Sequence, residues 1–248
     1  MANRVKGFID IHSHILPAMD DGAADMAEAA DMLKIAAREE ITAMVATPHF
    51  VPGISETDYV RVIQAVNGLN DLCSGVAPAI TVFPGNELYL IRGAFDSIKT
   101  GRCLTLAGSR CVLCELSMSE YPCEECLNEL ELLLKGGYIP ILAHPERYQW
   151  LPVHTGFLSA YIKKGCQLQI NAGSILGRFG RTAQKMAAYL LAEEMISYAA
   201  SDCHDTRDRK PGMKEAFHKL STRYGAKTAE KLTIHQPKSI MEKTRPKF

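Results

Sequence analysis

Histidine and carboxylate side chains recur in short segments of the sequence and form a set of candidate metal ligands. The segments contain five histidines, two glutamates and an aspartate: His12, His14, His49, Glu87, Glu115, His144, Asp202 and His204. Nitrogen and carboxylate ligands without thiolate suit manganese, iron or zinc. So many groups exceed the four protein ligands of one zinc site, which predicts two or three ions bridged by carboxylates. Such ions provide hydroxide at neutral pH and bind a phosphate oxygen, so the residues predict hydrolysis of a phosphoester.

Arginines close to two of these segments are candidates for binding the phosphate. Arg147 lies in the segment HPERY, and Arg207 and Arg209 lie in SDCHDTRDRKPG. A guanidinium group matches phosphate oxygens through two parallel hydrogen bonds. The alternative is a surface ion pair with a neighbouring acid. We expect Arg147 and Arg209 to bind phosphate and Arg207 to form a surface ion pair.

The candidate ligands follow short apolar runs that alternate with amphipathic stretches. The runs occupy residues 7–11, 43–47, 80–84, 111–116, 139–143, 167–170 and 195–200. Apolar residues at helical spacing predict helices over residues 26–37, 124–135, 181–193 and 214–223. This alternation predicts an α/β fold, either a parallel barrel or an open doubly wound sheet. Both folds place active sites at the carboxyl ends of their strands.

The candidate ligands lie at the carboxyl ends of the predicted strands, which is where both folds place their active sites. Six of the seven predicted strands end in His, Asp or Glu, and the other ends in Asn171. One histidine after a strand is more often a hydrogen-bonded structural residue than a ligand, but chance does not readily produce so many ends of this kind. Alternation along an extended chain should bring His12 together with His14, and Asp202 together with His204. We expect the remaining histidines at the surface; they are His154, His218 and His235.

The composition fits a single domain of residues 1–248, because α/β barrels often reach this length. The 28 basic and 28 acidic side chains give a formal net charge of zero, which argues against binding to nucleic acid. The sequence has no apolar run of membrane-spanning length, and its N-terminus lacks the apolar stretch of a signal peptide. We therefore expect a cytoplasmic protein without membrane insertion, whose cysteines are reduced.

Several segments, taken in order, resemble the polymerase and histidinol phosphatase (PHP) superfamily: DIHSHILPAMDDG, TPHF, GNELYL, CELSM, AHPERY and ASDCHD. Within it, the sequence is most similar to the bacterial manganese-dependent tyrosine-protein phosphatases of capsule and exopolysaccharide synthesis. The resemblance runs from about Phe8 to the QPKSIM segment near the C-terminus. It implies a distorted, TIM-like (β/α) barrel of seven strands that holds three divalent ions, manganese first and iron or zinc as alternatives.

The resemblance also implies a role for each residue. The implied ligand sets are His12, His14, Glu87 and Asp202 for one ion; Glu87, Glu115 and His144 for a second; and Asp21, His49 and His204 for a third. Arg147 and Arg209 match the phosphate-binding arginines, and Asp21 is also a candidate proton donor. The resemblance implies that the histidinol phosphatase branch has a histidine at the position of Glu115, whereas the tyrosine phosphatase branch has a glutamate. Glu115 therefore favours the tyrosine phosphatase branch. The implied partner is a phosphotyrosine-bearing protein, such as the tail of a bacterial tyrosine kinase.

The cysteines suggest a structural zinc site as an alternative use of part of the chain. Cys111/Cys114 and Cys123/Cys126 are two C-x-x-C pairs, as in a four-cysteine zinc site. Cys111 and Cys114 fall in a predicted strand, however, where residues three apart face opposite sides. We therefore interpret all four as small buried or half-exposed thiols.

Cys203 and Arg209 have the C-x5-R spacing of cysteine-dependent phosphatases. In that mechanism a loop binds phosphate through backbone N–H groups and stabilises a thiolate. The residues between Cys203 and Arg209 include no glycine and two aspartates, which would repel the phosphate. We therefore expect Cys203 not to be the nucleophile.

Three functions remain open from the sequence. The first is a protein-tyrosine phosphatase that regulates a bacterial tyrosine kinase in capsule or exopolysaccharide synthesis. The alternative is a small-molecule phosphoesterase of the same superfamily, such as a histidinol phosphatase, which turnover of small alkyl phosphates would distinguish. The third is a metal-binding or scaffold protein without activity. Loss of a ligand would indicate that function, and none of the expected ligands is missing from the sequence.

Overall fold

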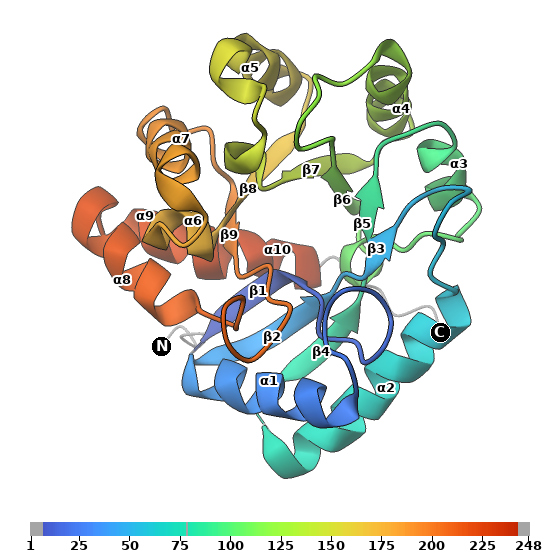
Figure 1. Ribbon diagram of the computed structural model, residues 1–248, viewed down its shortest axis with the longest axis vertical. Helices are drawn as coiled ribbons and strands as arrows, with labels where there is room; N and C mark the ends of the chain where they lie inside the picture. The colour runs from blue at the N-terminus through green and yellow to red at the C-terminus, as the bar shows by residue number, and fades with distance from the viewer. Residues whose placement is uncertain (1–6, 78, 243–248) are drawn as a thin grey trace.

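Parallel strands form the centre of the molecule, and helices surround them (Figure 1). The computed structural model describes residues 7–77 and 79–242. The strands are β1 (Phe8–Ser13), β2 (Ile41–Ala46), β3 (His49–Phe50), β4 (Thr81–Pro84), β5 (Glu87–Tyr89), β6 (Cys111–Glu115), β7 (Ile139–Ala143), β8 (Gln167–Asn171) and β9 (Tyr198–Ala200). Within the described ranges, no helix has both the length and the apolar character needed to cross a membrane.

The helices follow the strands along the chain. They are α1 (Met26–Arg38), α2 (Tyr59–Val76), α3 (Ala94–Lys99), α4 (Glu124–Lys135), α5 (Thr155–Lys163), α6 (Ala172–Leu176), α7 (Gly180–Ala192), α8 (Met213–Tyr224), α9 (Ala226–Glu230) and α10 (Gln236–Glu242). Short turns of 3-10 helix occupy Leu106–Gly108, Pro145–Arg147 and Leu151–Val153, and Lys231–His235 forms a π-helix. The predicted helices are confirmed, with ends that differ by at most one residue.

The strands pair in parallel as two sheets, with the orders β1-β2-β4 and β3-β5-β6-β7-β8-β9. β3 continues the direction of β2, and β5 continues β4, so the nine strands occupy seven positions around a barrel (Figure 1). β1 and β9 meet through two backbone hydrogen bonds, His14 N to Cys203 O at 2.8 Å and Asp202 N to His12 O at 2.9 Å. The expected barrel is confirmed, although these two bonds replace a full ladder at the seam.

Two of the predicted strands are broken, and the breaks shape the site. The strand expected at residues 80–84 does not run on to Glu87, because the chain turns at Gly85 and Asn86 before β5 begins. The Asn86 amide donates to Pro48 O at 3.0 Å and accepts from Leu104 N at 2.9 Å, which holds the turn. β2 likewise ends before Pro48, which has no N–H for the ladder. The second segments then pair with each other and place His49 opposite Glu87.

Alternation along the strands separates an outer core from the barrel interior. On β6, Val112 and Cys114 pack towards the helices, whereas Cys111 and Leu113 belong to a second cluster inside the barrel. The next inward position is Glu115, so the pleat that builds the interior also points this carboxylate into it. The opposite orientation of the two cysteines confirms that they do not face one site.

The loop between β1 and α1 folds tightly over the carboxyl end of β1. Ala23 N donates to His14 O at 3.0 Å, and Gly22 N donates to the Asp20 side chain at 3.0 Å. The helix that follows is capped by Asp25, whose carboxylate accepts from Glu28 N at 2.9 Å. Asp20, five residues before this cap, contacts a histidine instead.

Replacement of Gly22 by alanine should destabilise the protein, since a Cβ there would lie 1.9 Å from His14 O. We expect Gly22→Ala to lower the free energy of unfolding by about 1–3 kcal/mol, measured by urea denaturation. The control is Gly68→Ala within α2, where the nearest atom to the new Cβ is Met26 Cε at 3.9 Å. That change should stabilise the protein by about 0.5–1 kcal/mol. Equal stability of the two variants would contradict the described loop.

Candidate metal centre

The structure brings together all nine side chains that the sequence suggested as ligands. They fall into four overlapping groups, within each of which one ligand atom per residue lies within 4.8 Å of the others. The groups are His14, Asp21, His49 and His204; His12, His14 and Glu87; His12, His144 and Asp202; and His49, Glu87 and Glu115. These side chains come from the carboxyl ends of six strand positions and from the loop after β1.

Glu87 lies at the middle of these groups and is 1% exposed. Its Oε2 atom is 3.2 Å from His12 Nε2, 3.3 Å from His14 Nε2 and 3.1 Å from His49 Nδ1. Its Oε1 atom is 3.0 Å from His144 Nε2. Burial would raise the pKa of Glu87, but the charge of His12 and then the hydrogen bond from His144 lower it well below the usual value.

The outer part of the centre lies closer to solvent. Asp21 Oδ1 is 3.4 Å from His49 Nε2 and 3.3 Å from His204 Nε2, and the Asp21 side chain is 62% exposed. The His204 ring stacks on His14, with 3.9 Å between ring centroids. Hydrogen bonds from His204 and then His49 lower the pKa of Asp21, so its carboxyl group is ionised at neutral pH.

Asp202 divides its two oxygens between two sets of partners. Oδ1 faces imidazoles and lies 3.4 Å from His12 Nε2. Oδ2 accepts hydrogen bonds from Asn171 Nδ2 at 2.6 Å, Arg209 at 2.7 Å and Arg147 at 3.0 Å. This carboxylate therefore connects the imidazoles to both candidate phosphate-binding arginines.

The backbone takes the left-handed conformation at two of the candidate ligands, with φ of 35° at His144 and 53° at Asp202. Residues other than glycine rarely adopt this conformation, and they concentrate at functional sites. Asp202 and His204 converge as expected, with 3.6 Å between Asp202 Oδ1 and His204 Nδ1, but simple strand alternation does not bring them there. His12 and His14 converge too, with 3.2 Å between their Nε2 atoms.

Several polar side chains that orient the candidate ligands were not predicted from the sequence. His14 donates from Nδ1 to Asp20 Oδ2 at 2.6 Å, and His12 donates from Nδ1 to Gln169 Oε1 at 2.9 Å. Gln169 in turn donates to Asn171 at 2.9 Å. Such contacts fix the ring so that its other nitrogen faces a metal. The DDG motif could have pointed to Asp20, but Gln169 lies within a strand and carries no local signal.

The three arginines differ in burial: Arg147 and Arg209 lie at the edge of the centre, whereas Arg207 lies at the surface. Arg147 and Arg209 are half-buried at the edge of the centre, and their guanidinium carbons lie 4.5 Å and 5.8 Å from the centroid of the Phe179 ring. Phe179, just before α7, was not singled out from the sequence. Arg207 is exposed as expected, but its side chain forms no ion pair with any residue that the structure describes.

The comparisons with known proteins agree with this geometry. A family model described as "Capsular polysaccharide synthesis, CpsB/CapC" matches residues 8–242. The chain is 32% identical over 227 residues to tyrosine-protein phosphatase YwqE of Bacillus subtilis (strain 168), covering 91% of this chain and 88% of YwqE. The chain belongs to the CpsB/CapC family.

Other members of the CpsB/CapC family are similar along nearly their whole length. Tyrosine-protein phosphatase CpsB of Streptococcus pneumoniae is 30% identical over 239 residues, covering 94% of this chain and 98% of CpsB. A crystal structure reported for YwqE and S. pneumoniae CpsB, described as "unique metal-dependent tyrosine phosphatases", superposes with a TM-score of 0.88 at 30% identity. It covers 95% of each chain. The expected family and α/β barrel are therefore confirmed.

Cys203 does not fit the cysteine-dependent mechanism in this CpsB/CapC protein. Its side chain is fully buried, and burial, followed by the charge of Asp10, raises the pKa of its thiol well above the usual value. A nucleophilic cysteine needs the opposite shift. The zinc alternative has no support either, since the candidate ligand groups found among the described residues contain no cysteine.

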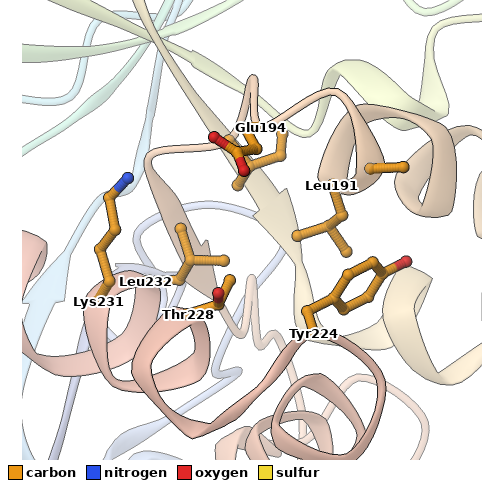
Figure 2. Close-up of a pocket in the computed structure, with 8 residues that line it drawn as sticks. Leu191, Glu194, Tyr224, Thr228, Lys231 and Leu232 are labelled. Carbon is orange, nitrogen blue, oxygen red and sulfur yellow. The ribbon is translucent and has the colours of Figure 1, made fainter.

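Figure 2 shows a hollow that lies away from these ligands. Its walls come from the end of α7, from α8 and α9 and from the π-helix, with Glu194 and Lys231 among the side chains. Ile196, also in its wall, precedes β9, so the hollow lies toward the amino ends of the strands. Active sites of parallel barrels lie at the other end. A different hollow, lined in part by Met118, Arg147 and Phe179, adjoins the metal centre.

In the metal-free CpsB/CapC protein the buried carboxylates change the protonation of nearby groups. Burial lowers the pKa of His14, but the hydrogen bond to Asp20 and the charges of Asp20 and Glu87 outweigh it and raise the pKa to about 9. The same balance, with Asp21 and Glu87, raises the pKa of His49 to about 11. Burial, followed by the charge of Glu87, raises the pKa of Glu115 to about 8. Protons thus balance part of the buried negative charge.

Removal of the Asp20 charge should lower the pKa of His14 in the metal-free protein. The pKa of His14 is about 9 in the folded protein and 6.5 for an unperturbed histidine, so its contribution to stability is complete below pH 6.5 and is lost as the pH rises through 9. We expect Asp20→Asn to reduce this contribution and to lower the pKa towards 6.5, with the part that comes from Glu87 retained. NMR titration of the imidazole nitrogens and urea unfolding between these pH values measure both effects. The control is His154→Gln, which changes an exposed histidine. An unchanged His14 titration in Asp20→Asn would contradict the proposed balance.

Proposed function

We propose that this protein is a metal-dependent protein-tyrosine phosphatase. The observation that carries the proposal is the junction at Asp202, where a carboxylate among candidate metal ligands also holds two arginines. A phosphate bound there would contact ions on one side and guanidinium groups on the other. The relatives named as tyrosine-protein phosphatases support the same activity.

We infer three divalent ions, with the ligand sets that the resemblance implied. Distances support the set of Asp21, His49 and His204, which form one group together with His14. They also support His12, His14 and Glu87 as neighbours, with Asp202 Oδ1 facing both imidazoles. Glu115 and His144 both lie beside Glu87, with 3.8 Å between Glu115 Oε1 and His144 Nε2, and we assign Glu87 as the carboxylate that would be shared between ions. Manganese suits this mixed nitrogen and oxygen set, as do iron and zinc.

A buried carboxylate oxygen without a hydrogen bond supports the presence of divalent ions at this centre. Glu87 Oε2 faces three imidazole nitrogens within 3.3 Å, yet it has no hydrogen bond of good geometry. An orphaned buried carboxylate oxygen is costly unless a cation lies beside it. Bound divalent ions would supply Lewis-acid activation of water and of the phosphate oxygens.

The residues of the chain perform the remaining tasks. Arg147 and Arg209 bind the outer phosphate oxygens and neutralise charge as it develops. Asp202 and the Phe179 ring hold both guanidinium groups in place before substrate arrives. The leaving phenolate has a pKa of about 10, so it needs less protonation than an alkoxide. The lowered pKa of Asp21 favours its role as a ligand over its role as a proton donor.

We prefer a protein substrate to histidinol phosphate because of the site's surroundings. Glu115 occupies the position at which the resemblance implies a histidine in the histidinol phosphatase branch. The hollow beside Arg147 and Phe179 offers room for residues that flank a phosphotyrosine. The family model refers to capsular polysaccharide synthesis. We infer that the substrate is a bacterial tyrosine kinase tail in the cytoplasm, and that residues 1–248 act as one domain.

Metal-stripped protein should regain turnover of a phosphotyrosine peptide when manganese is added. We expect little turnover of histidinol phosphate under the same conditions, and loss of peptide turnover by at least about 100-fold in Glu87→Gln. Cys203→Ser should stay within about threefold of the wild type, since the buried thiol takes no part. Loss of turnover in Cys203→Ser with metals still bound would favour the cysteine mechanism. Turnover of histidinol phosphate alone would move the function to the small-molecule alternative.

Lysine in place of either arginine should reduce kcat/KM for the peptide by about 100-fold, because an ammonium group cannot make the paired contact. The variants Arg147→Lys and Arg209→Lys keep the positive charge beside Asp202, so metal content should remain that of the wild type. The control is Arg207→Lys at the exposed position. Equal losses in all three variants, or kcat/KM of the wild type in Arg147→Lys and Arg209→Lys, would contradict the assignment of Arg147 and Arg209 to phosphate binding.

A further inference from the structure

Two thiols outside the metal centre lie in contact at the start of α4. Cys123 is the N-cap residue of this 12-residue helix, and Cys126 lies in its first turn. Their Sγ atoms are 3.1 Å apart. Cys123 is exposed and Cys126 is half-buried, so reagents in solution can reach the pair. The activity proposed above makes no use of either residue.

The other six cysteines have a different environment. Cys73, Cys103, Cys111, Cys114, Cys166 and Cys203 are all buried. Burial raises the pKa of buried thiols such as Cys114 and Cys166, which keeps them protonated and unreactive. Cys123 and Cys126 therefore form the accessible thiol pair among the described cysteines.

The two thiols of the pair are not equivalent. The backbone N–H and then the thiol of Cys126 donate to Cys123 Sγ and lower the pKa of Cys123. Burial, followed by the hydrogen bond with Cys123, raises the pKa of Cys126 to about 11. This asymmetry is typical of a dithiol in which one sulfur attacks and the other completes the bond.

We propose that Cys123 and Cys126 are a site of reversible oxidation by peroxides, which closes a disulfide at the start of α4. The Cys123 thiolate attacks the O–O bond of hydrogen peroxide, forms a sulfenic acid and releases hydroxide, which takes up a proton. The sulfur of Cys126 then attacks the sulfenic sulfur, the S–S bond forms, and water leaves with the Cys126 proton. Two thiols lose two electrons, and one peroxide becomes two waters.

The geometry permits this closure with little movement. A disulfide requires an S–S distance of about 2.05 Å, so the sulfurs must approach by roughly 1 Å, which rotation of the exposed Cys123 side chain supplies. The loop closed by the bond contains only two further residues, Glu124 and Glu125. So short a loop gains little stability from closure, and exposed disulfides of this kind are readily reduced.

The segment before Cys123 connects the pair to the rim of the metal centre. The Tyr121 ring packs on Trp150, with 5.3 Å between centroids. Trp150 Nε1 donates to Ser117 O at 2.8 Å, and Gln149 N donates to Met118 O at 2.7 Å. The same stretch carries Arg147, so a change at Cys123 reaches the rim through Tyr121. Trp150, the single tryptophan of the chain, reports such a change.

In the test, the full-length protein is reduced, stripped of metal with a chelator and treated with a small excess of hydrogen peroxide. We expect a mass loss of about 2 Da, a Cys123–Cys126 cross-link in the peptide map and reversal by dithiothreitol. Cys126→Ser should stop at a sulfenic acid on Cys123 that dimedone traps, and Cys123→Ser should oxidise at least about tenfold more slowly. Cys103→Ser, a change at a buried thiol, is the matched control and should behave as the wild type. Trp150 fluorescence should change on oxidation of the wild type and not of Cys123→Ser.

A disulfide that maps to other cysteines would overturn the proposal, as would equal oxidation rates in Cys123→Ser and the wild type. Oxidation of Cys123 to a sulfinic acid without a cross-link would overturn it as well. Cross-linking without a change in Trp150 fluorescence would overturn the connection to the rim. None of these measurements depends on phosphatase activity, so the outcome is independent of the function proposed above.

Discussion

The burial of Glu87 beside several imidazoles is the constraint on which the centre depends. Removing a carboxylate from water costs several kcal/mol unless opposite charge or hydrogen bonds compensate. Here the compensating groups are histidines, and no lysine ion pair is formed with Glu87 among the described residues. Imidazoles compensate a buried carboxylate either by holding protons or by sharing a cation with it. The raised pKa values of His14 and His49 represent the first state, and bound ions would provide the second.

This constraint explains why the barrel departs from regular geometry at one end. His49 can lie opposite Glu87 only because both strands are interrupted and begin again as β3 and β5. At the other side, His144 and Asp202 turn into the centre through left-handed backbone. Each departure has an energetic cost that the surrounding strands must support. The rest of the barrel, whose interior is filled by apolar side chains of the strands, provides that support.

Much of the fold and of the site follows from the sequence, because both depend on local patterns. Apolar runs and helical spacing gave the order of elements, and polar residues after the runs gave the convergence of ligands such as His12 and Glu115. The strand breaks were less visible, since Gly85 and Pro48 are common in many contexts. Gln169 and Phe179 could not be found in this way. Their roles depend on partners 30 or more positions distant, Gln169 on His12 and Phe179 on Arg147 and Arg209.

Asp202 shows why the candidate metal ligands and the candidate phosphate-binding arginines cannot be treated separately. One of its oxygens faces the imidazoles, and the other fixes both arginines. An ion held in part by Asp202 would withdraw electron density from the carboxylate and weaken its hold on the guanidinium groups. A phosphate that arrived would then compete with Oδ2 for N–H donors that are already oriented. Metal loading would in this way prepare the arginines for the substrate, which a chain with unconnected sites could not achieve.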